Sequence, residues 1–469
     1  MKNQENSTCG QCDILAAKVA ALEKDLAQLR EELAARKKNS STSSKPPSSD
    51  IVKPKPADLP DGQKRSIGGQ PGHPMHTREP FPHEQVTLFQ THALDACPDC
   101  GGGLRPNGAP RKVVQQVDIQ AVPLSIEQHT CLEYVCNHCG NHCQAGLPLH
   151  IEKGGLVGPD LTALIAFMKG GCHASFSTIR KFLRDIVGVS IARGTLSKII
   201  NKVSQALDGP YEELLHLLPH EDQLNIDETG HKDNGKRWWT WCLVADLYTF
   251  FKIDRQRSAG VLMELLGFDF DGVIGCDYFS AYRRYMRVCG VEVQFCLAHL
   301  IRDVKFLTTL PDLATKAYGE RLRLALKQLF EVIHRREKLS TAAFDRELAS
   351  ARDRVLDAGL NDVPSTRRAQ NMAERFRKHG QAFFTFITTP GTEPTNNLAE
   401  QAIRFVVIDR HITMGTRSEA GRRWSERIWT VIATCARHGR SVYAYLKEAI
   451  ACWFKDEPAP SLLPQGATA

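Results

Sequence analysis

Residues 224–229 read Leu-Asn-Ile-Asp-Glu-Thr, and this alternation of apolar and polar side chains constrains the fold more than any other segment. Successive side chains of a β-strand point to opposite faces, so Leu224 and Ile226 can face a core while Asp227 points the other way. An Asn-Gly pair at 234–235, a strong signal for a tight turn, leads into an aromatic run. The segment predicts a strand that carries a carboxylate and continues into a hairpin.

A second apolar segment, at 272–276, also ends on a carboxylate, Asp277. An apolar run at 248–253 precedes it and another at 291–296 follows it, and both are predicted strands. Leucines at helical spacing lie between the third and fourth strands. Three hairpin strands, a helix, a strand, a helix and a strand form the order of the ribonuclease-H-like fold.

A third carboxylate, Glu400, is predicted about one turn inside a helix that Thr395 or Asn396 can cap. Two strand-end aspartates and a helix-borne glutamate suit two-metal phosphoryl transfer, because carboxylate oxygens bind Mg²⁺ or Mn²⁺. One ion would activate the attacking hydroxyl and the other would stabilise the leaving 3′-oxygen. Each acid alone is a weak signal, and Asp269 is the rival to Asp277.

Two Cys-x-x-Cys pairs, separated by 35 residues and each followed by glycine, predict a structural zinc site. The four expected ligands are Cys97, Cys100, Cys136 and Cys139. Strand-like residues between the pairs favour a small zinc ribbon over 91–150. The other candidate ligands nearby are Cys131, Cys143, His138 and His142. A redox dithiol is the alternative interpretation.

Helical periodicity over 155–215 is interrupted by Gly-Val-Ser-Ile at 188–191, which predicts a helix-turn-helix-like domain. One expected apolar face consists of Ile179, Phe182, Leu183 and Ile186. Arg193 and Lys198 would lie near the start of the second helix and are candidates for DNA contact. Helical hairpins are also common in proteins that do not bind DNA.

Residues 10–36 carry leucine and valine at two heptad positions with charged flanks, which predicts a coiled coil. It would support self-association, although one amphipathic helix packed on the protein's own body is the competing interpretation. The stretch 37–90, rich in Ser, Pro and Lys at its start, is predicted to be a flexible basic linker.

The formal net charge of +7 is unevenly distributed along the chain. Residues 36–65 carry eight basic side chains against three acidic ones, and residues 404–440 carry the same numbers. Such basic segments are typical of nucleic-acid binding, with solvated surfaces as the alternative. No stretch approaches 18 consecutive apolar residues and no signal-peptide core is found. We therefore expect a cytoplasmic protein without a membrane partner, whose 15 cysteines are thiols and metal ligands rather than disulfides.

Four motifs carry a resemblance to a known family. They are Asn-Ile-Asp-Glu-Thr at 225–229, Cys-Asp-Tyr-Phe-Ser-Ala-Tyr at 276–282, Cys-Leu-Ala-His-Leu-Ile-Arg at 296–302 and Asn-Asn-Leu-Ala-Glu-Gln-Ala-Ile-Arg at 396–404. These motifs resemble the core of DDE transposases of the insertion-sequence 66 family. The coiled coil, the linker and the cysteine pairs fit the same layout, so the resemblance spans nearly the whole chain.

The resemblance implies that Asp227, Asp277 and Glu400 are a catalytic triad that binds two Mg²⁺ or Mn²⁺ ions. The reaction would be hydrolysis at a transposon end, followed by attack of the freed 3′-hydroxyl on target DNA. The partners implied are double-stranded DNA at terminal inverted repeats and target sites, a second copy of the chain or a higher oligomer, and accessory proteins of the same element. A bacterial, nucleoid-associated protein is expected.

Two segments depart from the family pattern, the run at 298–306 and the segment at 405–414. The run Ala-His-Leu-Ile-Arg-Asp-Val-Lys-Phe at 298–306 is less basic than the family pattern and includes Asp303. Beside the helix-turn-helix residues, the predicted DNA contacts are His299, Arg302, Lys305 and Arg404. A helix that packs on the sheet with polar residues outward is the alternative for His299 and Arg302.

The predicted architecture is multidomain α+β. A ribonuclease-H-like catalytic core over 220–410, with a helical insertion at about 305–390, follows the coiled coil, zinc ribbon and helix-turn-helix-like domain. A helical region at 411–455 and a disordered tail at 456–469 end the chain. The alternatives are a catalytically silent, transposase-derived DNA-binding protein and a ribonuclease-H-like nuclease without strand transfer, because one fold supports several chemistries.

Overall fold

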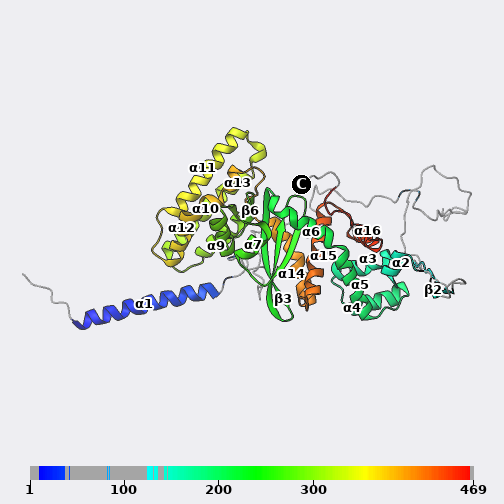
Figure 1. The fold of residues 1–469 in the computed structure, drawn as a ribbon. Coiled ribbons are helices and arrows are strands. Elements are labelled where there is room, and N and C mark those ends of the chain that lie inside the picture. Colours follow the sequence, from blue (N-terminus) through cyan, green and yellow to red (C-terminus); the bar gives the residue numbers. More distant parts are fainter. Residues whose placement is uncertain are drawn as a thin grey trace, which may run out of the picture. The chain divides into compact units, whose positions relative to one another are not determined.

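The computed structural model describes residues 10–36, 38, 42, 82, 84, 124–129, 131, 133–135, 142–144 and 146–464. The chain forms two compact units, one of residues 1–54 and 128–469 and one of residues 55–127. The predicted zinc ligands lie outside the described residues, namely Cys97, Cys100, Cys136 and Cys139. Within the described residues the protein is mixed α+β (Figure 1).

A five-stranded mixed sheet lies at the centre of the larger unit, in the order β5-β4-β3-β6-β7. The strands are β3 (Gln223–Asp233), β4 (Lys236–Val244), β5 (Thr249–Asp254), β6 (Val273–Cys276) and β7 (Glu292–Phe295). The first three form antiparallel hairpins, whereas β6 pairs in parallel with β3 and β7 in parallel with β6. All five strands agree with the sequence prediction, as does the burial of Leu224 and Ile226.

Helices cover both faces of this sheet. On the face that carries Ile226 lies α8 (Ser280–Cys289), whose Tyr282 meets Trp241 of β4 edge to face, and α7 (Ala259–Leu266) packs against α8. On the other face lies α14 (Asn397–Thr413), which contacts β3 and β4 along its length. The two faces therefore differ in chemistry, because the first is filled with apolar side chains and the second carries Asp227.

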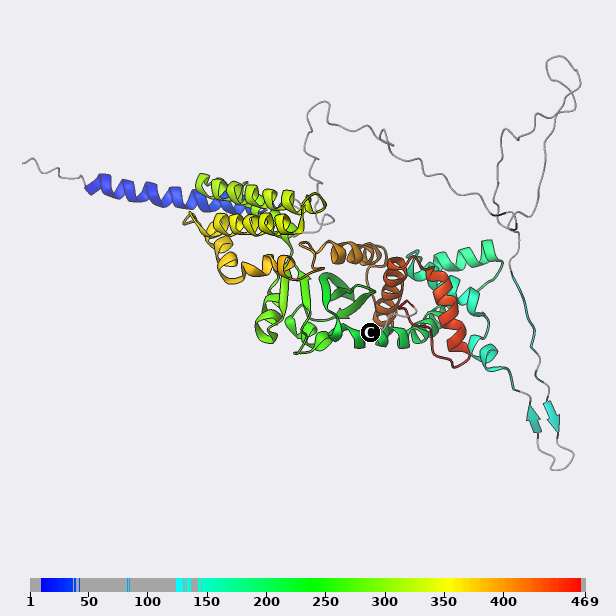
Figure 2. The same cartoon turned by 90° about the horizontal axis from the view of Figure 1, so that it is seen from above.

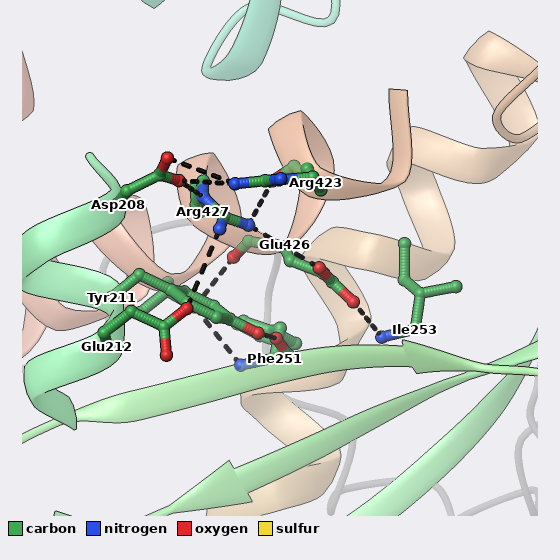
Figure 3. Close-up of polar contacts among 9 residues, drawn as sticks. Asp208, Tyr211, Glu212, Phe251, Ile253, Arg423, Glu426 and Arg427 are labelled. Carbon is green, nitrogen blue, oxygen red and sulfur yellow. Dashed lines mark hydrogen bonds and ion pairs between the residues drawn. The ribbon is translucent and has the colours of Figure 1, made fainter. Parts of the chain in front are cut away.

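The free edge of β5 is closed by a helix, α15 (Glu419–Arg437), in place of a sixth strand (Figure 3). Alternate backbone N–H groups of β5 donate to α15 side chains at four-residue intervals. Ile253 donates to Glu426 Oε1 at 2.7 Å, Phe251 to Thr430 Oγ1 at 3.2 Å and Thr249 to Thr434 Oγ1 at 3.2 Å. Two strand residues span about 6.6 Å and four helical residues about 6.0 Å, so the two periods match.

The same helix is tied to α6 (Asp208–Leu217) by a buried arginine. Arg427 is 4% exposed, pairs with Asp208 and lies 3.9 Å from Glu212 (Figure 3). Beside it, the Tyr211 hydroxyl donates to the Phe251 carbonyl at 2.9 Å. The edge strand therefore finds hydrogen-bond partners for its backbone from two helices rather than from water.

Further helices flank the sheet at its two ends (Figures 1 and 2). Between β7 and α14 the chain forms α9 (Leu297–Leu307), α10 (Leu313–Ile333), α11 (Thr341–Leu360), α12 (Arg367–His379) and α13 (Thr385–Thr388). The opposite end carries α2 (Leu149–Gly154), α3 (Pro159–Gly170), α4 (Phe176–Phe182), α5 (Arg193–Ala206) and α16 (Val442–Phe454). A two-stranded ribbon pairs β1 (Glu133–Val135) with β2 (His142–Gln144).

One predicted apolar position is wrong. Ile186 is exposed, although Ile179 and Leu183 are buried as expected. The chain leaves the α-helical pattern after Phe182 and forms a π-helical turn at Leu183–Val187. This turn advances the residues by a different angle, and the 3.6-residue period therefore misplaces the side chain that follows.

The N-terminal helix α1 (Gly10–Arg36) exposes its apolar stripe. The exposed stripe residues are Leu15, Val19, Leu22, Leu26, Leu29 and Leu33. Near its end, Glu31 pairs with Arg368 at 2.7 Å. Helix α1 therefore does not bury its heptad positions on the same chain. None of the described helices combines the length and hydrophobicity needed to cross a bilayer.

The closure of β5 by α15 predicts a specific loss of stability. In Thr430→Val the shape is kept, but the Phe251 N–H loses its acceptor inside the protein. An unsatisfied buried donor costs about 1–3 kcal/mol, so the midpoint of urea unfolding should fall accordingly.

The matched control is Thr240→Val on β4, whose buried hydroxyl finds no hydrogen-bond partner in the described part of the chain. This change should be neutral or stabilising, because it removes an unpaired polar group. Equal midpoints for Thr430→Val and Thr240→Val would contradict the proposed role of α15 as an acceptor row.

Candidate functional site

The strand register brings Asp227 and Asp277 to the same level of neighbouring strands. Asn225 of β3 lies opposite Gly275 of β6, and each aspartate follows two residues later in a parallel direction. A side chain at Gly275 would collide with the Asn225 amide, because a Cβ there would lie 2.5 Å from Nδ2. Glycine at this position therefore leaves room for the Asn225 side chain, which reaches the start of α14.

Two asparagines join the start of α14 to β3. The Asn225 Nδ2 donates to Asn396 Oδ1 at 3.0 Å, and Asn396 Nδ2 donates to the Ile226 carbonyl at 2.7 Å. Asn396 occupies the predicted cap position, but its side chain makes no capping hydrogen bond to the helix. The capping prediction is therefore wrong in its contact, because the tertiary contact to β3 takes the amide that would cap the helix.

Glu400 lies one turn inside α14 and faces α9. Its Oε2 accepts from Arg302 Nη2 at 3.3 Å, and its Oε1 lies 3.5 Å from His299 Nδ1. Among the residues that the structure describes, neither the Glu400 Oε1 nor the His299 Nδ1 has a hydrogen-bond partner, although both atoms are buried. The two atoms face one another at a distance longer than an ordinary hydrogen bond.

The carboxylates repel one another. Burial raises the pKa of Asp227 well above its usual value, and the charges of Glu228, Asp277 and Glu400 raise it further. Burial also raises the pKa of Asp277, although the charge of His299 opposes the shift. The pKa of His299 is lowered by burial, which favours its neutral form. This excess of negative charge favours a cation at the site.

The three predicted catalytic acids do not form one compact set of ligand atoms. Among the described residues, only Cys296, His299 and Glu400 have metal-ligand atoms that all lie within 4.8 Å of one another. A cavity of about 260 Å³ opens beside Asp277 and His299. Glu400 therefore faces α9, while the two aspartates stand on the sheet beside it.

Sequence analysis missed a fourth acid, Glu228, whose side chain is 1% exposed. Its Oε1 lies 2.6 Å from Arg257 Nη2, and its Oε2 accepts a hydrogen bond from the Tyr282 hydroxyl. Burial and the charge of Asp277 raise its pKa to about 7, although Arg257 opposes the shift. The strand alternation contained a signal, since it placed a carboxylate on the same face as Leu224 and Ile226.

The predicted DNA contacts fall into two groups. Lys305 and Arg404 are exposed, on α9 and α14, each one turn beyond a residue of the carboxylate site. Arg193 and Lys198 are exposed on α5, which packs on α3, α4, α15 and α16 rather than on the site. The rival acid Asp269 is exposed and precedes β6, at the opposite end of that strand from Asp277.

Comparison with known proteins identifies the family. Residues 154–423, more than half of the chain, match the model of the Transposase IS66 family, and the chain belongs to this family. Residues 4–79 match a family of unknown function, DUF6444. A curated relative is the uncharacterized protein y4hP of Sinorhizobium fredii, 21% identical over 416 residues, which cover 80% of this chain and 73% of the relative.

The raised pKa of Glu228 predicts that the free energies of unfolding of wild type and Glu228→Gln differ by an amount that depends on pH. Both are measured in the presence of a metal chelator, so that no bound cation contributes. Below about pH 4.5 the folded and unfolded states both carry the protonated acid. As the pH rises to about 7, the unfolded state ionises first, so the wild type loses a few kcal/mol relative to the variant. Denaturant unfolding at a series of pH values measures this difference.

The wild type must be compared with the variant because other groups titrate in the same pH range. Burial lowers the pKa of His231 to about 4, which stabilises the fold as the pH rises through 4 to 6.5. Glu264→Gln, at an exposed position of α7, is the matched control and should follow the wild type. A pH-independent difference between Glu228→Gln and wild type would rule out the shift.

Proposed function

We propose that this IS66-family protein is a DDE transposase that cleaves DNA at the ends of its element and joins them to target DNA. The carrying observation is that Asp227 within β3 and Asp277 just after β6 stand at the same level of neighbouring strands, and that the charges of Asp277 and Glu400 both raise the pKa of Asp227. Two divalent cations, Mg²⁺ or Mn²⁺, held by these carboxylates would activate the attacking hydroxyl and stabilise the leaving 3′-oxygen.

The arrangement of the sheet supports a ribonuclease-H-like core. Three antiparallel strands are followed by two that run parallel to the first, in the order β5-β4-β3-β6-β7. The acids of β3 and β6 come from its central pair of strands. A metal site fits here because the Glu400 Oε1 is buried and has no hydrogen-bond partner among the described residues. Within the same residues, Asp227 accepts from the Glu228 N–H and Asp277 from the Phe279 N–H, which leaves carboxylate oxygens for a cation.

Residues around the acids have roles of their own in this proposal. Arg302 lies within hydrogen-bond distance of Glu400 and offers further donors to a phosphate oxygen. His299, with its lowered pKa, is neutral near pH 7. Because Arg302 Nη1 donates to its Nε2, the ring proton lies on Nδ1, which can donate one hydrogen bond. Asn396 fixes the first turn of α14 against β3, and thus the position from which Glu400 extends.

Recognition of the element's ends is proposed for the segments outside the core. Helix α5 exposes polar and basic side chains and has no acid, as expected of a recognition helix in the major groove. The exposed residues of this kind are Arg193, Ser197, Lys198, Asn201 and Gln205. The cysteine pairs would hold a structural zinc ion, and the exposed stripe of α1 would pair two copies of the chain. Accessory proteins of the same element are further candidate partners.

The reaction is tested with a labelled duplex of the element's end, in Mg²⁺ or Mn²⁺. Asp227→Asn and Glu400→Gln should each lower strand cleavage and joining roughly a thousandfold, because several kcal/mol of transition-state stabilisation are lost. Asp269→Asn, at the exposed rival position, should keep wild-type rates.

Other outcomes would point elsewhere. End-specific binding without cleavage in either metal, with accessory proteins present, would favour a silent DNA-binding regulator. That alternative draws support from the distribution of ligand atoms, since Glu400 groups with Cys296 and His299 rather than with the aspartates. Cleavage without joining would favour a nuclease, and cleavage that survives both substitutions would exclude the assigned acids.

The role of α5 predicts a loss of end-specific binding. Arg193→Ala and Lys198→Ala should each weaken binding to the element's end, by roughly tenfold for a lost charge-assisted hydrogen bond. The matched control is Lys316→Ala at an exposed position of α10. Fluorescence anisotropy with end and unrelated duplexes measures the effect, and equal affinity of all three variants for the end would refute a reading role for α5.

A further inference from the structure

The β3–β4 hairpin extends well beyond the carboxylate site. The ladder between β3 and β6 ends at Asn225, whereas β3 and β4 remain paired as far as Asp233 and Lys236. At about 3.3 Å per residue, the part of β3 beyond Asp227 projects roughly 20 Å past the catalytic acids. Helices α14 and α15 cover one face of the hairpin. The other face is the one toward which the Glu228 side chain points.

Aromatic rings and guanidinium groups alternate along this second face. Arg257 lies over the Phe279 ring at 3.9 Å and over the Trp239 ring at 4.6 Å, and Arg237 lies over Trp239 at 4.7 Å. We call Phe279, Arg257, Trp239 and Arg237 the arginine–tryptophan ladder. It begins two residues after Asp277 and leads outward along the hairpin, so it is continuous with the carboxylate site.

The ladder presents positive charge to solvent. Arg237 is exposed and Trp239 is partly exposed, and Lys232 and Lys236 are exposed farther out. No ion pair of Arg237 is found in the part of the chain that the structure describes. Asp254, opposite Trp239, is the acid nearest in register, and its Oδ1 accepts from the Gln256 N–H at 2.6 Å. A guanidinium stacked by its face on a ring keeps its in-plane N–H donors available for a phosphate.

The tip of the hairpin is held in place by the loop between α14 and α15. The Asn234 N–H donates to the Thr416 carbonyl at 2.8 Å, and the Thr416 N–H donates to the Lys232 carbonyl at 2.9 Å. The Thr416 hydroxyl donates to Asp233 Oδ1 at 2.7 Å. These hydrogen bonds hold the hairpin that carries the ladder in one position. Less conformational entropy is therefore lost when the ladder binds a negatively charged nucleic-acid strand.

We propose that the arginine–tryptophan ladder binds the phosphate backbone of the DNA that extends away from the reacting phosphodiester. Arg237 pairs with a phosphate, Trp239 holds the Arg237 side chain in its stacked orientation, and Arg257 links the ladder to Glu228. Such contacts are independent of DNA sequence, because every nucleotide presents the same phosphate. The inference rests on the proposed function, since it assumes that the DNA reacts at the neighbouring carboxylates.

The test measures binding of the full-length chain to a short duplex of arbitrary sequence over a range of salt concentrations. Arg237→Ala should bind roughly tenfold more weakly, and the slope of log affinity against log salt should fall by about one counterion. Arg237→Lys, which keeps the charge, should keep most of the salt slope. Arg287→Ala, an equal charge change at an exposed position of α8, should match the wild type.

The outcomes separate this inference from the proposed function. If the wild type binds and cleaves DNA but Arg237→Ala keeps its affinity and slope, the ladder does not bind DNA and the transposase proposal stands. The ladder is also refuted if Arg237→Ala and Arg287→Ala weaken binding equally, because the effect is then one of overall charge. If the wild type neither binds nor cleaves any duplex, both proposals fail. Unchanged thermal melting of the variants shows that the fold is intact.

Discussion

Repulsion between like charges acts where Asp227, within β3, stands beside Asp277, just after β6, and the surrounding structure holds the charges in place against it. Asp227 and Asp277 cannot move apart, because the parallel ladder through Asn225 and Gly275 sets their level. Burial of the apolar residues on the opposite face of β3 contributes the stability that offsets the repulsion. The charges can be relieved by protons or by cations, and the raised pKa of Asp227 reports the first of these.

Helix α14 is fixed at both ends, which determines where Glu400 extends. Its start is bound to β3 through Asn396, and near its end Arg410 donates to Thr229 Oγ1 at 2.8 Å. Between these contacts, Asp409 lies 2.7 Å from His173 Nδ1, in the turn between α3 and α4. Helix α14, which carries Glu400, thereby contacts both the strand that carries Asp227 and the helical region that precedes the sheet. A displacement of that helical region would act directly on α14.

Much of the core was predictable from the sequence because its signals are local. The alternation at 224–229 and the apolar run at 272–276 each carry their strand and its acid within a few residues. The contacts of Glu228 and Asn396 were not predictable, because their partners lie far away along the chain. The π-helical turn that exposes Ile186 was missed because it breaks the period on which the prediction depends. Long-range contacts therefore decided the first two cases, and a local change of helical period decided the third.

The closure of β5 by α15 also has a consequence for the timing of folding during synthesis. The edge of β5 is complete by Asp254, but its hydrogen-bond acceptors begin at Glu426. At 5–20 residues per second, a ribosome needs on the order of 10 to 30 s to make the chain between them. During that interval the nascent sheet has an open edge, and for most of it the chain also lacks Glu400. Until α15 is made, the backbone groups at this edge are open to pairing with another strand.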